Sequence, residues 1–203
     1  MTTTADQLIS YQELDRPEQF TQANLDWVPW LEPIPEAELT DVHYAALVQR
    51  GRAGSPYFRL LVRDPHVLEA RTKTDNDIFH NTADGLPRAE RELSAAVTSR
   101  VNGCVFCASV HARFASSFSK RSADVQRLLE DVDSDIDVRW NAVRTASSAL
   151  TKTPVEFDGA NIDELSEAGL SDLEIVDVIN GASFFNWANR LMLSLGEPVN
   201  PPE

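Results

Sequence analysis

Hydrophobic positions recur at helical spacing along most of the chain, and no stretch sustains the alternation of apolar and polar residues typical of a β-strand. Leu93, Val97 and Val101, for example, repeat every four residues, with Ala96 beside them. This spacing gathers apolar side chains on one face of a helix, where they can pack against a core. The pattern predicts an all-α fold.

Start and stop signals divide the helical pattern into separate segments. A capping Asp or Ser, a proline in the first turn and a glycine after the last turn mark the ends. Ser122, for example, is a candidate cap. The signals predict helices over about 35–49, 55–61, 65–80, 86–101, from 104 onward, 122–129, 137–150 and 172–195.

Residues 1–34 differ from the rest of the chain. They are polar and contain prolines, which oppose a long helix, but also Trp27 and Trp30, which favour burial. We therefore expect an extended N-terminal arm over 1–34 that packs on the domain or on a neighbouring subunit. The helical domain would then occupy 35–203.

Charge and hydropathy restrict the partners. The formal net charge of −14 over 203 residues repels nucleic acid and anionic membrane surfaces, so we expect neither as a partner. No apolar run approaches the ~20 residues that span a bilayer. The first six residues lack a basic or apolar signal segment, which indicates a cytoplasmic protein.

The chemistry concentrates between Asn102 and His111. Cys104, Cys107 and His111 lie on one stripe if this segment is helical, and Gly103 before them predicts that the helix starts at about Cys104. Unpaired N–H groups and the helix dipole at such a start favour thiolate over thiol. An imidazole one turn further on can accept or pass a proton at neutral pH. The segment therefore offers an activated dithiol beside a base.

Glu92 on the preceding predicted helix can return to the thiols across a helical hairpin. A carboxylate hydrogen-bonded to His111 would fix the tautomer of the ring and raise its basicity. The chain from Glu92 through His111 to a cysteine sulfur follows the logic of activated thiol enzymes.

Other interpretations of these residues remain open. The two cysteines can be small buried hydrophobes. Together with His111 and Glu92 they could bind zinc, but this spacing on one straight helix suits a tetrahedron poorly, so we expect no metal and no cofactor. Asn186 and Arg190 could bind a substrate carboxylate, although a structural link is the expected role.

The motif resembles a known family. The run Leu86–Glu92, followed by Asn102-Gly103-Cys104-x-x-Cys107-x-x-x-His111, is similar to the alkylhydroperoxidase D (AhpD)-like branch of the carboxymuconolactone decarboxylase superfamily. The segment Phe184–Arg190 also resembles its closing helix. The likeness covers roughly 36–198, with the motif core at about 63–125.

The resemblance implies an AhpD-like helical bundle that forms a homo-oligomer. It implies thiol-dependent reduction of a small hydroperoxide, with an external dithiol as reductant and with Glu92, Cys104, Cys107 and His111 as redox and proton-relay residues. The family's characterised member points to the second cysteine, here Cys107, as the attacking thiol. Helix-start geometry instead favours Cys104 as the more exposed attacker.

One departure from the family pattern stands beside the second cysteine. The peroxidase prototype has a histidine directly before that cysteine, and this chain has Phe106. A proton-transfer group is therefore missing. Lactone chemistry like that of carboxymuconolactone decarboxylase, or a non-catalytic oligomeric scaffold, are the alternative functions; the decarboxylases of the superfamily generally lack the Cys-x-x-Cys pair.

Overall fold

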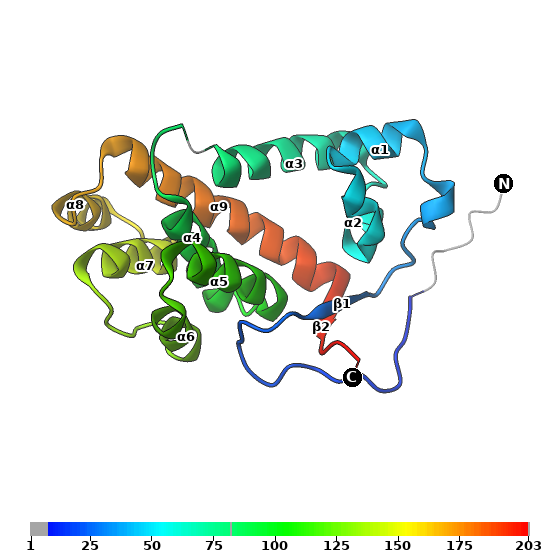
Figure 1. Ribbon diagram of the computed structural model, residues 1–203, viewed down its shortest axis with the longest axis horizontal. Helices are drawn as coiled ribbons and strands as arrows, with labels where there is room; N and C mark the ends of the chain where they lie inside the picture. Colours follow the sequence, from blue (N-terminus) through cyan, green and yellow to red (C-terminus); the bar gives the residue numbers. More distant parts are fainter. Residues whose placement is uncertain (1–7, 82, 203) are drawn as a thin grey trace.

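The computed structural model describes residues 8–81 and 83–202. Helices dominate this part of the chain, as the periodicity predicts. Two short strands, one near each end of the chain, pair with each other (Figure 1). The elements are β1 Asp26–Pro29, η1 Glu36–Glu38, α1 Asp41–Leu47, η2 Arg50–Gly54, α2 Pro56–Leu61, α3 Pro65–His80, α4 Arg88–Val101, α5 Val105–Ser119, α6 Ser122–Glu130, α7 Val138–Thr151, α8 Gly159–Glu167, α9 Asp172–Leu195 and β2 Gly196–Val199, where η marks a 3-10 helix.

Local sequence signals account for most helix ends. The Asp64 side chain accepts a hydrogen bond from the backbone N–H of Val67 and starts α3, and Ser171 with Glu174 forms a capping box at α9. The predicted cap at Ser122 is wrong, because Ser122 is already the first residue of α6 and Arg121 is its N-cap. The expected helix over 35–49 is also divided, into η1 and α1.

The helices α4, α5 and α9 form the centre of the molecule, with α6, α7 and α8 at one end and α1 and α2 at the other (Figure 1). Helix α4 packs against α5, α7 and α9, and most of its residues are buried. Its apolar stripe, including Leu93 and Val97, belongs to the main core. The position of α4 therefore determines where its polar residues lie.

The two strands were not expected. β1 pairs with β2 in an antiparallel ribbon, with Trp27 opposite Pro198 and Pro29 opposite Gly196. Each strand has only four residues, too few for a periodic signal to stand out. Trp27 is buried in a second core cluster, which also contains Tyr57 of α2 and Phe185 of α9. The division of the chain at residue 34 stays a prediction.

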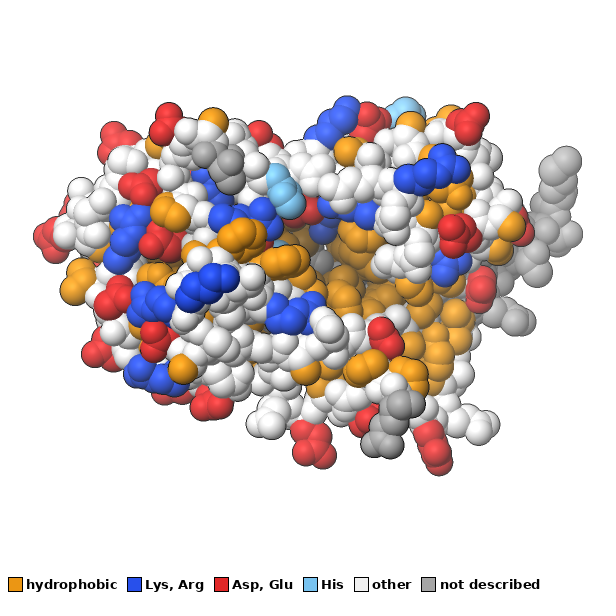
Figure 2. Space-filling model, viewed as in Figure 1, with side chains coloured by type: hydrophobic (Ala, Val, Ile, Leu, Met, Phe, Trp, Pro, Cys, Tyr) orange, Lys and Arg blue, Asp and Glu red, His pale blue; other side chains and the backbone are white. Residues whose placement is uncertain are grey.

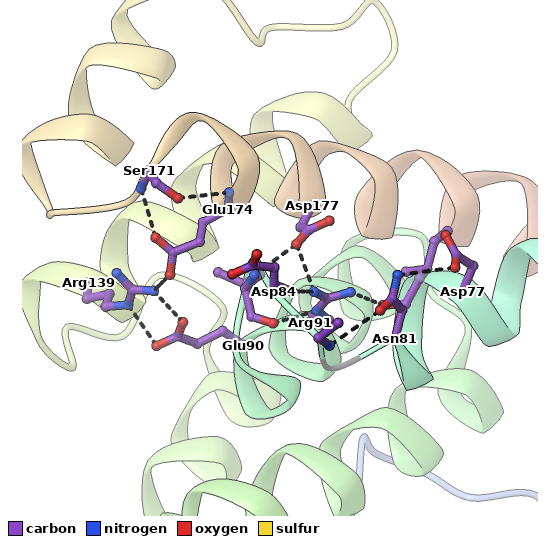
Figure 3. A network of polar contacts seen from close by, with 12 residues as sticks. Asp77, Asn81, Asp84, Glu90, Arg91, Arg139, Ser171, Glu174 and Asp177 are labelled. Carbon is purple, nitrogen blue, oxygen red and sulfur yellow. Dashed lines mark hydrogen bonds and ion pairs between the residues drawn. The ribbon is translucent and has the colours of Figure 1, made fainter.

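A buried polar network fixes the N-terminal end of α4 (Figure 3). The Arg91 guanidinium donates to the backbone carbonyls of Leu86, Ile78 and Asp84, and pairs with Asp177 of α9 at 2.9 Å. On the same helix, Glu90 accepts two hydrogen bonds from Arg139 of α7. Because α4 is tied to three other elements here, the next turn, which carries Glu92, is held firmly.

No helix in the described ranges has both the length and the apolarity needed to cross a membrane.

Candidate functional site

A tight turn places the two cysteines at the start of α5. Gly103 has φ = +77°, a left-handed conformation that strains any residue with a Cβ. The N–H of Cys104 donates to the carbonyl of Ser99 at 2.9 Å, which closes the turn after α4. Cys104 is the N-cap of α5 and Cys107 lies in its first turn. The predicted helix start is confirmed.

Both cysteines are free thiols and both are buried, but they differ in access. Cys104 is 1% exposed and Cys107 is 6% exposed. The expectation that Cys104 is the more accessible thiol is therefore wrong. Both thiols approach Asn189 of α9, but Cys107, one turn further on, also reaches the cavity described below.

The two thiols influence each other's ionisation in opposite directions. A hydrogen bond from the Cys107 thiol holds the pKa of Cys104 below its usual value, against the effect of burial; the backbone N–H of Cys107 and the side-chain amide of Asn189 act in the same direction. The bond to Cys104 and burial raise the pKa of Cys107 well above its usual value. The pair therefore loses its first proton to give a Cys104 thiolate that the Cys107 thiol stabilises.

Glu92 and His111 form the expected contact. Glu92 Oε2 lies 2.6 Å from Nδ1 of His111, and the other carboxylate oxygen pairs with Arg88 at 2.5 Å. Glu92 is fully buried, so its charge depends on these two partners for compensation. Since an ionised carboxylate can only accept, Nδ1 of His111 carries the hydrogen and Nε2 is left free to act as a base.

Two aromatic side chains that contact each other, Phe79 and Phe185, pack against the imidazole. The ring of Phe185 lies 4.0 Å from the His111 ring and that of Phe79 lies 5.4 Å from it, measured between ring centroids. The ring is 9% exposed. These contacts, with the bond to Glu92, restrict the imidazole to one orientation.

A cavity of about 840 Å³ opens beside these groups. Hydrophobic side chains gather around a hollow between α5, α2 and β1 in the space-filling view (Figure 2). Cys107, His111 and Glu92 all line the cavity, and Cys104 is not among the lining residues of the described chain. This volume fits a small organic molecule and is much larger than a peroxide group needs.

The structure thus brings together the four residues that the sequence singled out. Cys107, His111 and Glu92 share one wall, and Cys104 lies directly behind Cys107. Phe106 also lines the cavity, at the place where the family prototype has a histidine.

Other polar residues near the motif and on α9 have structural roles. Arg100 donates to the carbonyl of Leu129, and Arg113 donates to that of Ala23. Arg190 bonds to Asn186, whose side chain also bonds to Asn102. Thus Arg190 and Asn186 form the expected structural link, away from the cavity lining.

Two contributors to the site were missed. Arg88 compensates Glu92, and their i, i+4 spacing on α4 could have revealed it. Asn189, fully buried on α9, approaches the thiols and donates to Ser99 Oγ at 3.0 Å. No local pattern marks Asn189, since its partners are about 90 residues away in sequence. Within residues 8–81 and 83–202, no group of three or more His, Cys, Asp or Glu residues is arranged to hold a metal ion.

Comparison with known proteins finds a family that part of the chain matches. Residues 65–152 match the carboxymuconolactone decarboxylase family, and this segment contains all four residues of the motif. The chain carries a carboxymuconolactone decarboxylase-family segment in an AhpD-like fold. The resemblance seen in the sequence is confirmed. No curated protein gives a significant match to the chain.

Solved structures show the same AhpD-like fold. An uncharacterised peroxidase-related protein from Ralstonia eutropha JMP134, described as an alkylhydroperoxidase AhpD core, superposes with a TM-score of 0.70 at 24% identity, over 83% of this chain and 90% of that one. A peroxidase-related protein from Silicibacter sp. TM1040 gives 0.68 at 23%, over 81% and 89%. The debrominase Bmp8 gives 0.66 at 16%, over 80% and 87%.

Proposed function

We propose that this AhpD-like protein reduces organic hydroperoxides through a Cys104–Cys107 dithiol/disulfide cycle, with Glu92 and His111 as the proton relay. The observation that carries the proposal is the shared cavity wall: one thiol, one imidazole and one buried carboxylate meet where a small molecule can enter. The peroxidase-related names of the similar structures agree with this reaction class.

Cys107 is the attacking residue in this proposal because its sulfur lines the cavity and that of Cys104 does not. His111 Nε2 takes the first proton that the dithiol loses, while Glu92 stabilises the imidazolium that forms. The remaining proton passes from Cys107 to Cys104 along their hydrogen bond as Cys107 attacks. The Cys107 thiolate attacks one peroxide oxygen and the O–O bond breaks. The alkoxide leaves with the proton from His111, so ROOH becomes ROH and Cys107 becomes a sulfenic acid.

Cys104 completes the cycle. The lowered pKa of Cys104 favours loss of its proton, and the thiolate attacks the sulfenic sulfur of Cys107. The S–O bond breaks, the hydroxyl takes up that proton and leaves as water, and the disulfide forms. An external dithiol then reduces this disulfide by two thiol–disulfide exchanges and is itself oxidised. We also propose a cytoplasmic homo-oligomer as the working form, in line with the sequence-based expectation.

The test is peroxide consumption with a dithiol reductant in the wild type and in the Cys104→Ser and Cys107→Ser variants. We expect turnover to stop in both variants. In Cys104→Ser, a single equivalent of hydroperoxide should leave a sulfenic acid on Cys107 that dimedone traps and mass spectrometry locates. Full turnover in both variants would refute the cycle, and a trapped sulfenic acid on Cys104 in Cys107→Ser alone would reverse the two roles.

The same variants separate the two alternative functions. A lactone decarboxylase should keep its activity when both cysteines are serine. A non-catalytic scaffold should consume no hydroperoxide, and its buried thiols should react with alkylating reagents only on unfolding.

A further inference from the structure

The cavity contains a buried cation that the proposed cycle does not use. Arg71 of α3 lines the cavity, is 7% exposed, and has no hydrogen-bond partner for Nε or Nη1 among the described residues. Its guanidinium instead lies over aromatic rings, 5.2 Å from the centroid of Phe184 and 5.8 Å from that of Phe58. Buried donors without acceptors are costly in a folded protein, so an arginine held this way is a candidate ligand-binding group.

The charges around Arg71 leave an excess of positive charge. Asp75 lies 3.7 Å from Arg71 and 3.5 Å from Arg52, so one carboxylate serves two guanidinium groups. Arg52 also has an unpaired buried Nη1. Elsewhere on the cavity lining, Arg88 and Glu92 compensate each other, and Asp26 is exposed to solvent.

Two further polar groups on the cavity lining are unsatisfied. Trp27 Nε1 and Tyr57 Oη are both buried without a hydrogen-bond partner in the described chain. Burial raises the pKa of the Tyr57 phenol, so it stays protonated and can donate, although Arg71 nearby acts in the opposite direction. The Trp27 and Tyr57 ring centroids lie 5.6 Å apart, and the Arg71 guanidinium lies 6.0 Å from the centroid of Tyr57. The three side chains therefore present N–H and O–H donors in one part of the cavity.

This donor cluster lies within electrostatic range of the attacking sulfur. The pKa of Cys107 is raised chiefly by its bond to Cys104 and by burial, and the charge of Arg71 opposes that rise. The cavity between them is lined mainly by apolar and aromatic side chains, including Phe79, Phe106 and Met192. A ligand that fills this space therefore needs an apolar body with one anionic end.

We propose that Arg71, with Trp27 and Tyr57, forms a carboxylate-binding subsite, and that the substrate is an organic hydroperoxide with an apolar body and a carboxylate. A planar guanidinium can bind a carboxylate through two parallel N–H···O bonds, and the mainly apolar lining of the cavity suits the organic body that carries a carboxylate. The identity of the reacting group rests on the proposed function. The anion site itself does not.

Binding tests the subsite without any redox step. The probes are 4-isopropylbenzoate and its neutral counterpart 4-isopropylbenzamide, titrated by calorimetry into the full-length protein with both cysteines reduced. We expect the benzoate to bind at least about tenfold more tightly, the effect of one charge-assisted hydrogen bond. Arg71→Met should remove this preference, and Arg71→Lys should keep part of it.

Lys73→Met is the matched control, because it removes one positive charge from the same helix at an exposed position paired with Glu69. It should keep the wild-type preference. Equal affinity of the wild type for the two probes would overturn the subsite, whether or not Arg71→Met folds. A preference that survives in well-folded Arg71→Met would overturn it as well.

Turnover then tests the substrate class. The 4-carboxylate of cumene hydroperoxide carries one carboxylate group that cumene hydroperoxide lacks. We expect its kcat/KM to be higher by about tenfold, and we expect this difference to be lost in Arg71→Met. If Arg71 is purely structural, Arg71→Met should lower kcat/KM for both hydroperoxides by the same factor and leave their ratio unchanged. Benzoate preference with no turnover of either hydroperoxide would refute the proposed function alone, and turnover without a charge preference would refute the subsite alone.

Discussion

Glu92 of α4 and His111 of α5 lie on different helices, yet the carboxylate and the imidazole meet at 2.6 Å in a buried contact. The turn at Gly103 folds α5 back along α4, so residues from the two helices share one wall. The carboxylate cannot rotate away, because Arg88 holds its other oxygen. A relay of fixed orientation follows from this packing.

Replacing Glu92 with glutamine should therefore reduce hydroperoxide turnover. The amide keeps the shape but cannot stabilise an imidazolium, so we expect kcat/KM to fall by about 10²-fold, within the range for general acid–base groups. The control is Glu90→Gln, which removes another buried carboxylate on α4 that pairs with Arg139 outside the cavity lining. Unchanged kcat/KM in folded Glu92→Gln would show that the relay plays no part in the reaction.

The two thiols should titrate separately. Because the pKa of Cys104 is lowered and that of Cys107 is raised, the ultraviolet absorbance of thiolate should rise in two steps. One step should fall below the usual cysteine pKa of about 8.5 and the other well above it. The first thiolate is lost as the pH falls through the lower pKa. The Cys107→Ala variant removes the hydrogen bond that contributes most to the lowered pKa of Cys104, so that pKa should rise. A single step of two thiolates near the usual value would contradict the coupling.

Asn189→Leu should raise the pKa of Cys104 as well, though less than the loss of Cys107. The amide of Asn189 favours the thiolate, and leucine has similar size but no donor. Ser99 and Asn102 would lose a partner, so we expect a stability loss of about 1–3 kcal/mol, measured by urea unfolding. Asn186→Leu, which also removes an acceptor from Asn102, is the control that should leave the thiolate titration unchanged.

Gly103→Ala should destabilise the fold. A Cβ at this position would meet nothing within 4 Å, so the whole effect comes from the φ of +77°, which costs roughly 1–2 kcal/mol in a residue with a side chain. Gly51→Ala is the matched control, since a Cβ at Gly51 would also meet open space and the φ of Gly51 lies outside the left-handed region. The midpoints of denaturant unfolding measure the stability change of each variant. Equal midpoints for the two variants would mean that the turn tolerates a side chain.

Phe106→His should raise hydroperoxide turnover. The substitution puts a second proton-transfer group on the cavity wall beside Cys107, and we expect a gain of about tenfold in kcat. Stopped-flow consumption of peroxide in the wild type and variant measures it, with Phe106→Leu as the control for lost aromatic packing. A histidine variant no faster than the leucine variant would show that His111 alone supplies the protons.

The sequence by itself determined the helical architecture and the site's central residues, because these depend on nearest neighbours along the chain. The period of Leu93 and Val97, the Asp64 cap and the Gly103 break are local signals, and the three helices that they mark, α4, α3 and α5, lie where these signals predict. The pairing of Glu92 with His111 followed from the same local logic, as two adjacent helices joined by a short turn must pack together. Helix α8 was missed, as were the two strands.

Tertiary structure alone decided which thiol lines the cavity: Cys107 does, the cysteine to which the family resemblance points, and Cys104, which helix-start geometry favours, does not. It also decided what surrounds them: Arg71 from α3, Asn189 from α9 and Trp27 from β1 come from distant parts of the chain. No periodicity links such residues, since their proximity results from helices closing around one cavity. The physical reason is that helix formation depends on neighbours in sequence, whereas burial and unpaired charge depend on neighbours in space.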